Sequence, residues 1–340
     1  MLFRSKGDPV APLRKALQTG HCDVRPESVA LEVLVDGTGT RATGVRYLDA
    51  EGVEHTVTAD AVVVACGAFE TPRLLLRSGI GNSSDLVGRN LMFHLQTIVL
   101  GIFPFRLHGD RGRDVTHLMD DPIVGDELTM AAAREAGLPY LRGGIVEHGG
   151  SGKPVMEALH TPMGRHHTQR MVESMQRDHM MAFTMQGEDL PQATNRVDLD
   201  PRVRDVWGLP VGRITYAPHA HDAACAMHWG PRLEAVLREA GAEHTFWVTS
   251  PGFEGGPSAG LHPMSRHWMG TARMGTDPTT SVCDPWQRLW DVPNVMIADS
   301  SVFPTSSGYG PTLTLVALAI RAARELAGLA QLRSARSDAI

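Results

Sequence analysis

The feature that most constrains the fold is an apolar run that is followed at once by a glycine turn and a helical pattern. Residues 61–65 read Ala-Val-Val-Val-Ala, and a strand that is apolar on both faces is typical of the interior of a parallel sheet. Cys66 and Gly67 supply the turn, and residues 70–76 predict a helix with Pro72 near its first turn. Strand, tight turn and helix form the usual mononucleotide-binding corner of an α/β sheet, so we expect such a sheet here.

The residues before this corner predict an antiparallel hairpin. Apolar side chains alternate with others over residues 29–35, residues 36–39 read Asp-Gly-Thr-Gly, and a returning strand begins at Gly44. The same glycines loosely resemble a dinucleotide-binding fingerprint. Their spacing is wrong for it and no helix pattern follows them, so we interpret them as a hairpin turn.

The C-terminal part resumes the strand and helix pattern. Residues 294–298 predict a second buried strand, and Asp299 and Ser300 follow it directly. A final helix is predicted from about Thr312, with Leu315, Leu318, Ala319, Ala322 and Leu326 on one face. Residues 100–260 are rich in Met and His and show only short periodic stretches, which favours a separate α+β domain between the two ends.

Charge and cysteine content exclude several function classes. Lys and Arg number 32 against 38 Asp and Glu, so the chain has no basic field for a nucleic acid or an anionic membrane. No apolar stretch reaches the roughly twenty residues of a transmembrane helix. The four cysteines lie far apart without a CxxC pair, which argues against a disulfide scaffold or a zinc ribbon.

A metal site is the weakest of the chemical hypotheses. His221, Cys225 and His228 share one helix face by spacing, and His219 lies nearby. No carboxylate or second cluster completes the set, so we predict no metal and keep a metal-dependent enzyme only as a competing hypothesis.

Several long motifs, in order along the chain, carry a family resemblance. The matching segments are residues 67–81, 87–94, 188–191, 267–275, 298–305 and 310–314. They resemble the glucose–methanol–choline (GMC) family of FAD-dependent alcohol oxidoreductases, and the resemblance covers nearly the whole chain.

The resemblance implies both a fold and an activity. It implies an α/β fold, with an incomplete Rossmann-like FAD-binding domain (residues 1–98 and 263–332) and an α+β substrate domain with an antiparallel sheet (residues 99–262). The implied cofactor is FAD. The implied reaction is oxidation of a small-molecule alcohol at its CH–OH group by hydride transfer to the flavin, and the final electron acceptor cannot be inferred.

The implied catalytic base is His267, because this step needs a group that titrates near neutral pH. The helix that begins near Thr312 would direct free N–H groups and its positive dipole end at the negative charge of reduced flavin. Pro311 and Gly310 suit that helix start, since proline needs no hydrogen-bond partner there and glycine permits close approach.

Other residues are implied to contact the rest of the cofactor. Asp299 resembles the family residue near the ribityl and pyrophosphate region, and Ser300 follows it where the family usually has glycine. Cys66 and Gly67 resemble the turn that flanks the ADP part, and Ala30 is placed near adenine.

Two departures from the family pattern define the alternative hypothesis. Gly310 stands where the family has Asn or His as the second catalytic group, and losing that hydrogen bond costs on the order of 2–4 kcal/mol of transition-state stabilisation. We also find no N-terminal βαβ unit with a GxGxxG fingerprint. The alternative is therefore a non-catalytic truncated fragment, or one half of a split flavoprotein that needs a partner chain for the missing unit. Localisation is left open.

Overall fold

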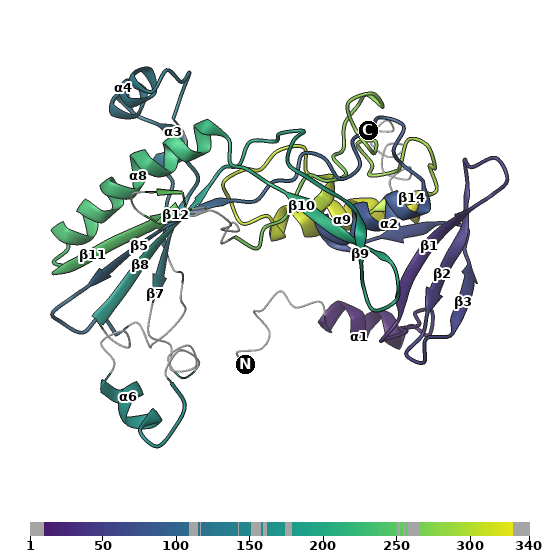
Figure 1. The fold of residues 1–340 in the computed structure, drawn as a ribbon, viewed down its shortest axis with the longest axis horizontal. Coiled ribbons are helices and arrows are strands. Elements are labelled where there is room, and N and C mark those ends of the chain that lie inside the picture. Colours follow the sequence, from purple (N-terminus) through teal and green to yellow (C-terminus); the bar gives the residue numbers. More distant parts are fainter. Residues whose placement is uncertain are drawn as a thin grey trace, which may run out of the picture.

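The chain folds into two unequal parts that lie side by side along its long axis (Figure 1). The structure is a computed structural model. It describes residues 10–108, 115, 117–141, 143–150, 158, 162–173, 179–249, 252–253, 256–257 and 265–328. One part is formed by both ends of the chain, and the other by its middle, which agrees with the α/β plus α+β class predicted from the sequence.

The part built from the two ends contains an antiparallel sheet and a short parallel pair. The sheet has the order β1-β2-β3, with strands Val29–Val35, Ala42–Leu48 and Glu54–Thr58. Asp36 closes its first turn by accepting the N–H of Gly39, which confirms the predicted hairpin. The parallel pair joins β4 (Val62–Val64) to β14 (Val295–Ile297), with Val62 opposite Val295.

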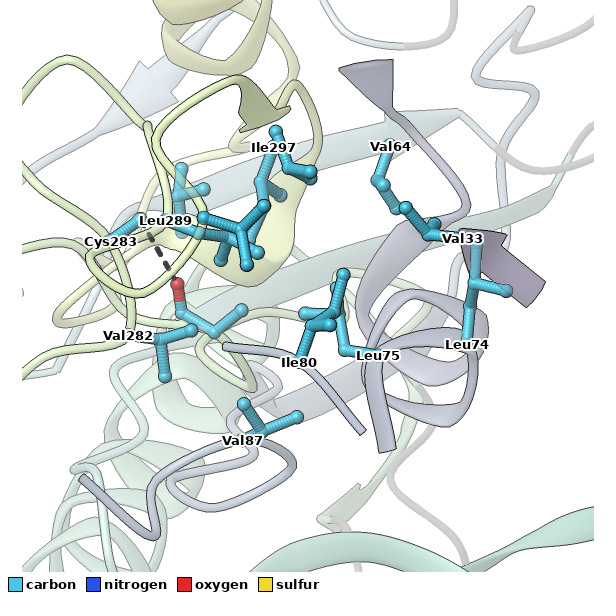
Figure 2. Close-up of a cluster of buried hydrophobic side chains, with 14 of the residues drawn as sticks. Val33, Val64, Leu74, Leu75, Ile80, Val87, Val282, Cys283, Leu289 and Ile297 are labelled. Carbon is cyan, nitrogen blue, oxygen red and sulfur yellow. Dashed lines mark hydrogen bonds between the residues drawn. The ribbon is translucent and has the colours of Figure 1, made fainter. Parts of the chain in front are cut away.

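Helix α2 (Gly67–Ser78) packs between this sheet and the parallel pair. Figure 2 shows the resulting core, in which Leu74 and Leu75 of α2 face Val33 of β1 and Ile297 of β14. Residues far apart in sequence thus share one hydrophobic cluster. Burying such side chains contributes about 1.5–3 kcal/mol each.

Two local expectations were wrong. Within the described residues β4 pairs only with β14, and Val63 is 49% exposed, so this strand is not covered on both faces. Helix α2 begins at Gly67 rather than near residue 70, which places Pro72 in its interior. Proline has no N–H to donate to Ala68, and the Ala68 carbonyl instead accepts the hydroxyl of Thr271 at 2.8 Å.

The middle of the chain forms a large antiparallel sheet with a helix on one face. The sheet has the order β13-β12-β11-β5-β8-β7-β6. Its strands are β5 (Leu95–Ile102), β6 (Leu118–Met119), β7 (Val146–Gly150), β8 (Met180–Gly187), β11 (His244–Thr249), β12 (Gly252–Phe253) and β13 (Gly256–Pro257). Helix α8 (Ala220–Glu239) packs on β5, β8 and β11, and Trp229 and Leu233 fill the space beneath it.

Smaller elements complete the described chain. A hairpin of β9 (Arg196–Arg204) and β10 (Pro210–Thr215) reaches from the large sheet to α2. The helices α1 (Val10–Gln18), α3 (Asp121–Val124), α4 (Glu127–Glu135) and α6 (His167–Glu173) lie at the periphery in Figure 1. Helices in the described ranges are all too short or too polar to span a membrane.

The last helix, α9 (Thr312–Leu326), starts at the predicted residue. Leu315 and Leu318 pack on the core of the first part, as predicted, whereas Leu326 is exposed. A second apolar stripe that includes Leu313 faces away from this core, and Leu313 is 83% exposed. The periodicity identified the helix correctly and overestimated how much of it is buried.

Candidate active site

Two histidines meet where the two parts of the molecule join. Met92 and Met269 form an antiparallel bridge, each donating its N–H to the carbonyl of the other at 3.0 Å. This antiparallel register places His94, two residues after Met92, opposite His267, two residues before Met269. Nδ1 of His94 and Nδ1 of His267 are 2.9 Å apart, and the rings are in edge-to-face contact.

Burial keeps both imidazoles in their neutral forms. His94 is completely buried, and this desolvation, with the charge of His267 second, lowers its pKa to about 3. Burial also lowers the pKa of His267, and the carboxylate of Glu147 acts in the opposite direction. At neutral pH the pair therefore shares a single hydrogen between two uncharged rings.

The segment that follows His267 is held in place by close backbone contacts. Gly270 has φ +94°, and a Cβ there would lie 2.2 Å from the Asn90 carbonyl oxygen, so only glycine fits. The Gly270 N–H donates to the Ser300 carbonyl at 3.2 Å. Trp268 stacks on Phe69 in the first turn of α2, with ring centroids 4.3 Å apart. His267 is thus connected to the loops at the ends of the parallel strands.

The side chain of Asp299 connects the loops that follow β4 and β14. The side chain is 6% exposed, and its Oδ2 accepts the Gly67 N–H at 3.0 Å as well as the Thr71 hydroxyl. Its Oδ1 accepts the N–H of Ser301 at 2.8 Å and so caps the short helix η2 (Ser300–Val302). Cys66, Gly67, Asp299 and Ser300 are therefore brought together at the carboxyl ends of β4 and β14, where open α/β sheets bind ligands.

The hydrogen bonds of Asp299 limit which atoms at the carboxyl ends of β4 and β14 are available to a ligand. Both carboxylate oxygens of Asp299 already have protein partners, so its contribution there is to hold Gly67 and η2 in position. Cys66 is exposed as a whole residue, but the atoms around its sulfur desolvate the thiol and raise its pKa, which disfavours a thiolate.

The start of α9 has the features expected of an anion-binding helix end. Pro311 is its N-cap residue and no side chain caps the first turn, so the N–H groups at Thr312 and beyond have no side-chain acceptor there. Gly310 is exposed, with no atom within 4 Å of where a Cβ would stand. The loop before it is fixed to the large sheet, because Ile145 donates its N–H to the Gly308 carbonyl at 3.0 Å.

Ala30 lies apart from this region, on β1 of the antiparallel sheet, and is exposed. Ala30 lines a shallow surface hollow of about 410 Å³. The hollow is lined by Asp23, Arg25, Ser28, Ala30, Val45, Tyr47 and Val57.

The histidines of α8 do not converge on a metal site. Nδ1 of His221 contacts Asp222 at 3.0 Å, and His219 is used as the helix cap, where it accepts the His221 N–H. His228 instead stacks edge-on against Trp229. No group of three or more His, Cys, Asp or Glu side chains with metal-binding geometry occurs in the ranges that the structure describes.

His94 is the functional candidate that the sequence motifs did not single out. It ends the segment Val87–His94, which matched the family pattern, yet nothing local marks it as a partner of His267. Only the bridge between Met92 and Met269 reveals the pairing, and that register cannot be read from either segment alone.

Comparison with known proteins agrees with the sequence motifs. A family model described as GMC oxidoreductase matches residues 191–319, and an N-terminal model of the same description matches residues 5–96. Because the N-terminal model matches here, the comparisons give no support to a separate partner chain.

Relatives and solved structures point the same way. A 2-methyl-1,2-propanediol dehydrogenase of Mycolicibacterium austroafricanum is 34% identical over 301 residues, which are 83% of this chain and 50% of the relative. A C-glycoside 3-oxidase of Arthrobacter globiformis is 34% identical over 316 residues, 90% of this chain and 53% of the relative. The chain thus spans about half the length of these relatives.

The fold similarity covers most of the chain. A crystal structure of formate oxidase superimposes with a TM-score of 0.60 at 19% identity and covers 87% of this chain and 59% of that one. Pyridoxine 4-oxidase from Mesorbium loti gives a TM-score of 0.55 at 18% identity over 88% of this chain and 57% of that one. By its motifs, family models and fold, the chain belongs to the GMC oxidoreductases, a family whose cofactor is FAD.

Proposed function

We propose that this chain acts in a FAD-dependent oxidoreductase that oxidises an alcohol at its CH–OH group, with His267 as the base that accepts the hydroxyl proton. The observation that carries the proposal is the hydrogen bond between His94 and His267, where the two parts of the molecule join. The similar proteins include a propanediol dehydrogenase and a C-glycoside 3-oxidase, which is consistent with a hydroxyl-bearing substrate.

We assign the donor role in this hydrogen bond to His267, because that tautomer is the one a base requires. A neutral imidazole accepts a proton at Nε2 only when its Nδ1 carries the other hydrogen. With His267 as donor and His94 as acceptor, the single hydrogen between the two Nδ1 atoms leaves Nε2 of His267 free. Because burial keeps His94 neutral, its lone pair is retained and also stabilises His267 after protonation.

The residues present fit the cofactor. The N-terminus of α9 lacks a side-chain cap, which suits an anionic flavin, and Gly67 and Ser300 line the ends of the parallel strands where the ribityl and pyrophosphate groups would be held. The hollow at Ala30 would take the adenine. When bound, FAD supplies the hydride acceptor.

Two separate hydrophobic cores support the proposed domain division. One hydrophobic cluster joins Val33 and Leu75 to Ile297, and another, under α8, contains only residues of the middle segment. We assign residues 1–98 and 263–332 to the FAD-binding domain and 99–262 to the substrate domain. Residues 262–264 and 329–332 of these boundaries lie outside the described residues.

The test is the absorbance of FAD added to the purified chain, followed without oxygen during titration with a panel of alcohols. Wild-type protein is expected to bleach the flavin, His267→Ala to slow bleaching by about 10²–10⁴-fold, and the exposed-site control His166→Ala to match wild type. A His267→Ala variant as fast as wild type would refute the assignment of the base. A folded chain that retains no flavin would refute independent catalysis and favour the fragment hypothesis.

A further inference from the structure

Three polar side chains form a row across adjacent strands of the large sheet. Gln96 on β5 lies directly opposite Gln186 on β8, and Glu147 on β7 lies opposite Thr184, two residues before Gln186. The Gln96 amide donates to Oε1 of Gln186 at 2.9 Å, and the Gln186 amide donates to Oε2 of Glu147 at 3.2 Å. The row is thus one directed chain of hydrogen bonds that ends on a carboxylate.

The row lies on the face of the sheet opposite to α8. Val99, Val146 and Met185 point into the core beneath α8 and are buried. Side chains alternate between the faces of a strand, so Gln96, Gln186 and Glu147 belong to the other face. A row that only linked strands would not need a carboxylate at its end, because amides or hydroxyls satisfy one another at lower desolvation cost.

The same row borders the histidine pair. Gln96 is two residues after His94 and therefore leaves the chain on the same side. Glu147 is near enough for its charge to influence the pKa of His267, and Gln186 influences that of His94. From the other part of the molecule, the Gly308 loop meets the backbone of Gln186 and Gly144. The row, the histidine pair and the loop before α9 thus lie together where the two parts of the molecule meet.

The side-chain atoms at the two ends of the row can form hydrogen bonds with hydroxyl groups. Gln186 is 4% exposed and its two hydrogen bonds in the row engage both the oxygen and the nitrogen of its amide, whereas Gln96 and Glu147 at the two ends are only half-buried. Within the part of the chain that the structure describes, no hydrogen bond engages Oε1 of Gln96 or Oε1 of Glu147, which leaves an acceptor at each end of the row. Among the ion pairs of the described residues none involves Glu147, so its charge is not neutralised by a neighbouring side chain.

We propose that Gln96 and Glu147, held in line by Gln186, bind the additional hydroxyl groups of a polyol whose reacting CH–OH lies against His267, so that the site selects polyols over mono-alcohols. This inference rests on the proposed function for the position of the reacting carbon. The binding of a polyol to the row can be measured without turnover.

The experiment is saturation-transfer NMR on the full chain with erythritol, butane-1,2-diol and butan-1-ol as probes. Erythritol is expected to bind more tightly than butan-1-ol. Glu147→Gln and Gln96→Leu should each weaken the binding of erythritol by about tenfold, which is the effect of losing one hydrogen bond to a charged or fixed partner. Both variants should change butan-1-ol less than twofold. Glu51→Gln, an exposed glutamate in the turn between β2 and β3, is the matched control and should bind all three probes as wild type does.

Two results would overturn the inference: wild type that binds erythritol no better than butan-1-ol, or variants that weaken both probes equally. Circular dichroism checks folding, and Gln96→Asn, which keeps the amide, replaces Gln96→Leu if the latter unfolds. Polyol binding in this assay needs neither proton transfer nor flavin reduction. Intact polyol binding without any flavin bleaching would therefore count against the proposed function alone.

Discussion

Replacing His94 with leucine tests the histidine pair directly. Leucine fills a buried volume of similar size to that of histidine, and it lacks the Nδ1 acceptor that lies 2.9 Å from Nδ1 of His267. A hydrogen bond to a charged group contributes about 1.5–3 kcal/mol. Protonated His267 loses that stabilisation in the variant, so proton acceptance should slow by about 10- to 150-fold.

The expected pH dependence has a definite sign. Losing the acceptor destabilises the protonated form of His267 and lowers its pKa further, so the acidic limb of the flavin-bleaching profile should move to lower pH. His94→Asn, whose side-chain oxygen occupies nearly the place of Nδ1, should restore most of the rate. Substrate binding should be unchanged in both variants.

A nitrogen NMR experiment reads the same pair without flavin. In the wild type the His267 ring should carry its hydrogen on Nδ1, and in His94→Leu the hydrogen should redistribute to Nε2. An unchanged tautomer together with an unchanged bleaching rate in His94→Leu would refute the reasoning, because the bond would then do nothing for His267.

Three further predictions follow from the described contacts. Asp299→Asn has one acceptor oxygen for two groups of donors, so it should lower the free energy of unfolding by about 1–3 kcal/mol in urea titration. Unchanged stability would contradict the structural role given to the Asp299 hydrogen bonds. Gly310→Asn meets open space, so the variant should fold normally and bleach flavin at least about tenfold faster; a slower variant would contradict the role assigned to this position. Burial raises the pKa of Asp189 to about 7, above its value near 3.9 in unfolded chains. The folded state therefore holds the extra proton, so stability should fall as pH rises from about 4 to 7, and Asp189→Asn should flatten this fall in thermal melts.

Local patterns predicted most of the first part of the fold. The alternation over Val29–Val35, the Asp36 turn and the helix from Thr312 depend on neighbours a few residues away, and the structure confirms each. Their signals survive because the same short period sets both the sequence pattern and the buried face.

Features set by distant parts of the chain were not predictable in this way. An apolar run such as residues 61–65 indicates a strand, but the number of neighbouring strands decides whether Val63 is covered, and here it is not. Pro72 is accommodated inside α2 because Thr271, from the other end of the chain, supplies the missing donor. Neither fact is contained in the segment itself.

The candidate site shows the same division. His267 was predicted from its motif, whereas His94 and the row of Gln96, Gln186 and Glu147 became visible only through strand register. The family resemblance predicts that Asp299 lies near the cofactor, and the contacts add that its carboxylate is engaged by Gly67 and Ser301.

The most direct test of the central claim compares an alcohol carrying deuterium at the reacting carbon with its ordinary form. Anaerobic flavin reduction by the full chain is measured by stopped flow in wild type and in His267→Ala. We expect a slower reaction with the deuterated alcohol in the wild type, and a rate about 10²–10⁴-fold lower in the variant. Wild-type and variant proteins with equal rates, or no flavin reduction by any alcohol, would contradict it.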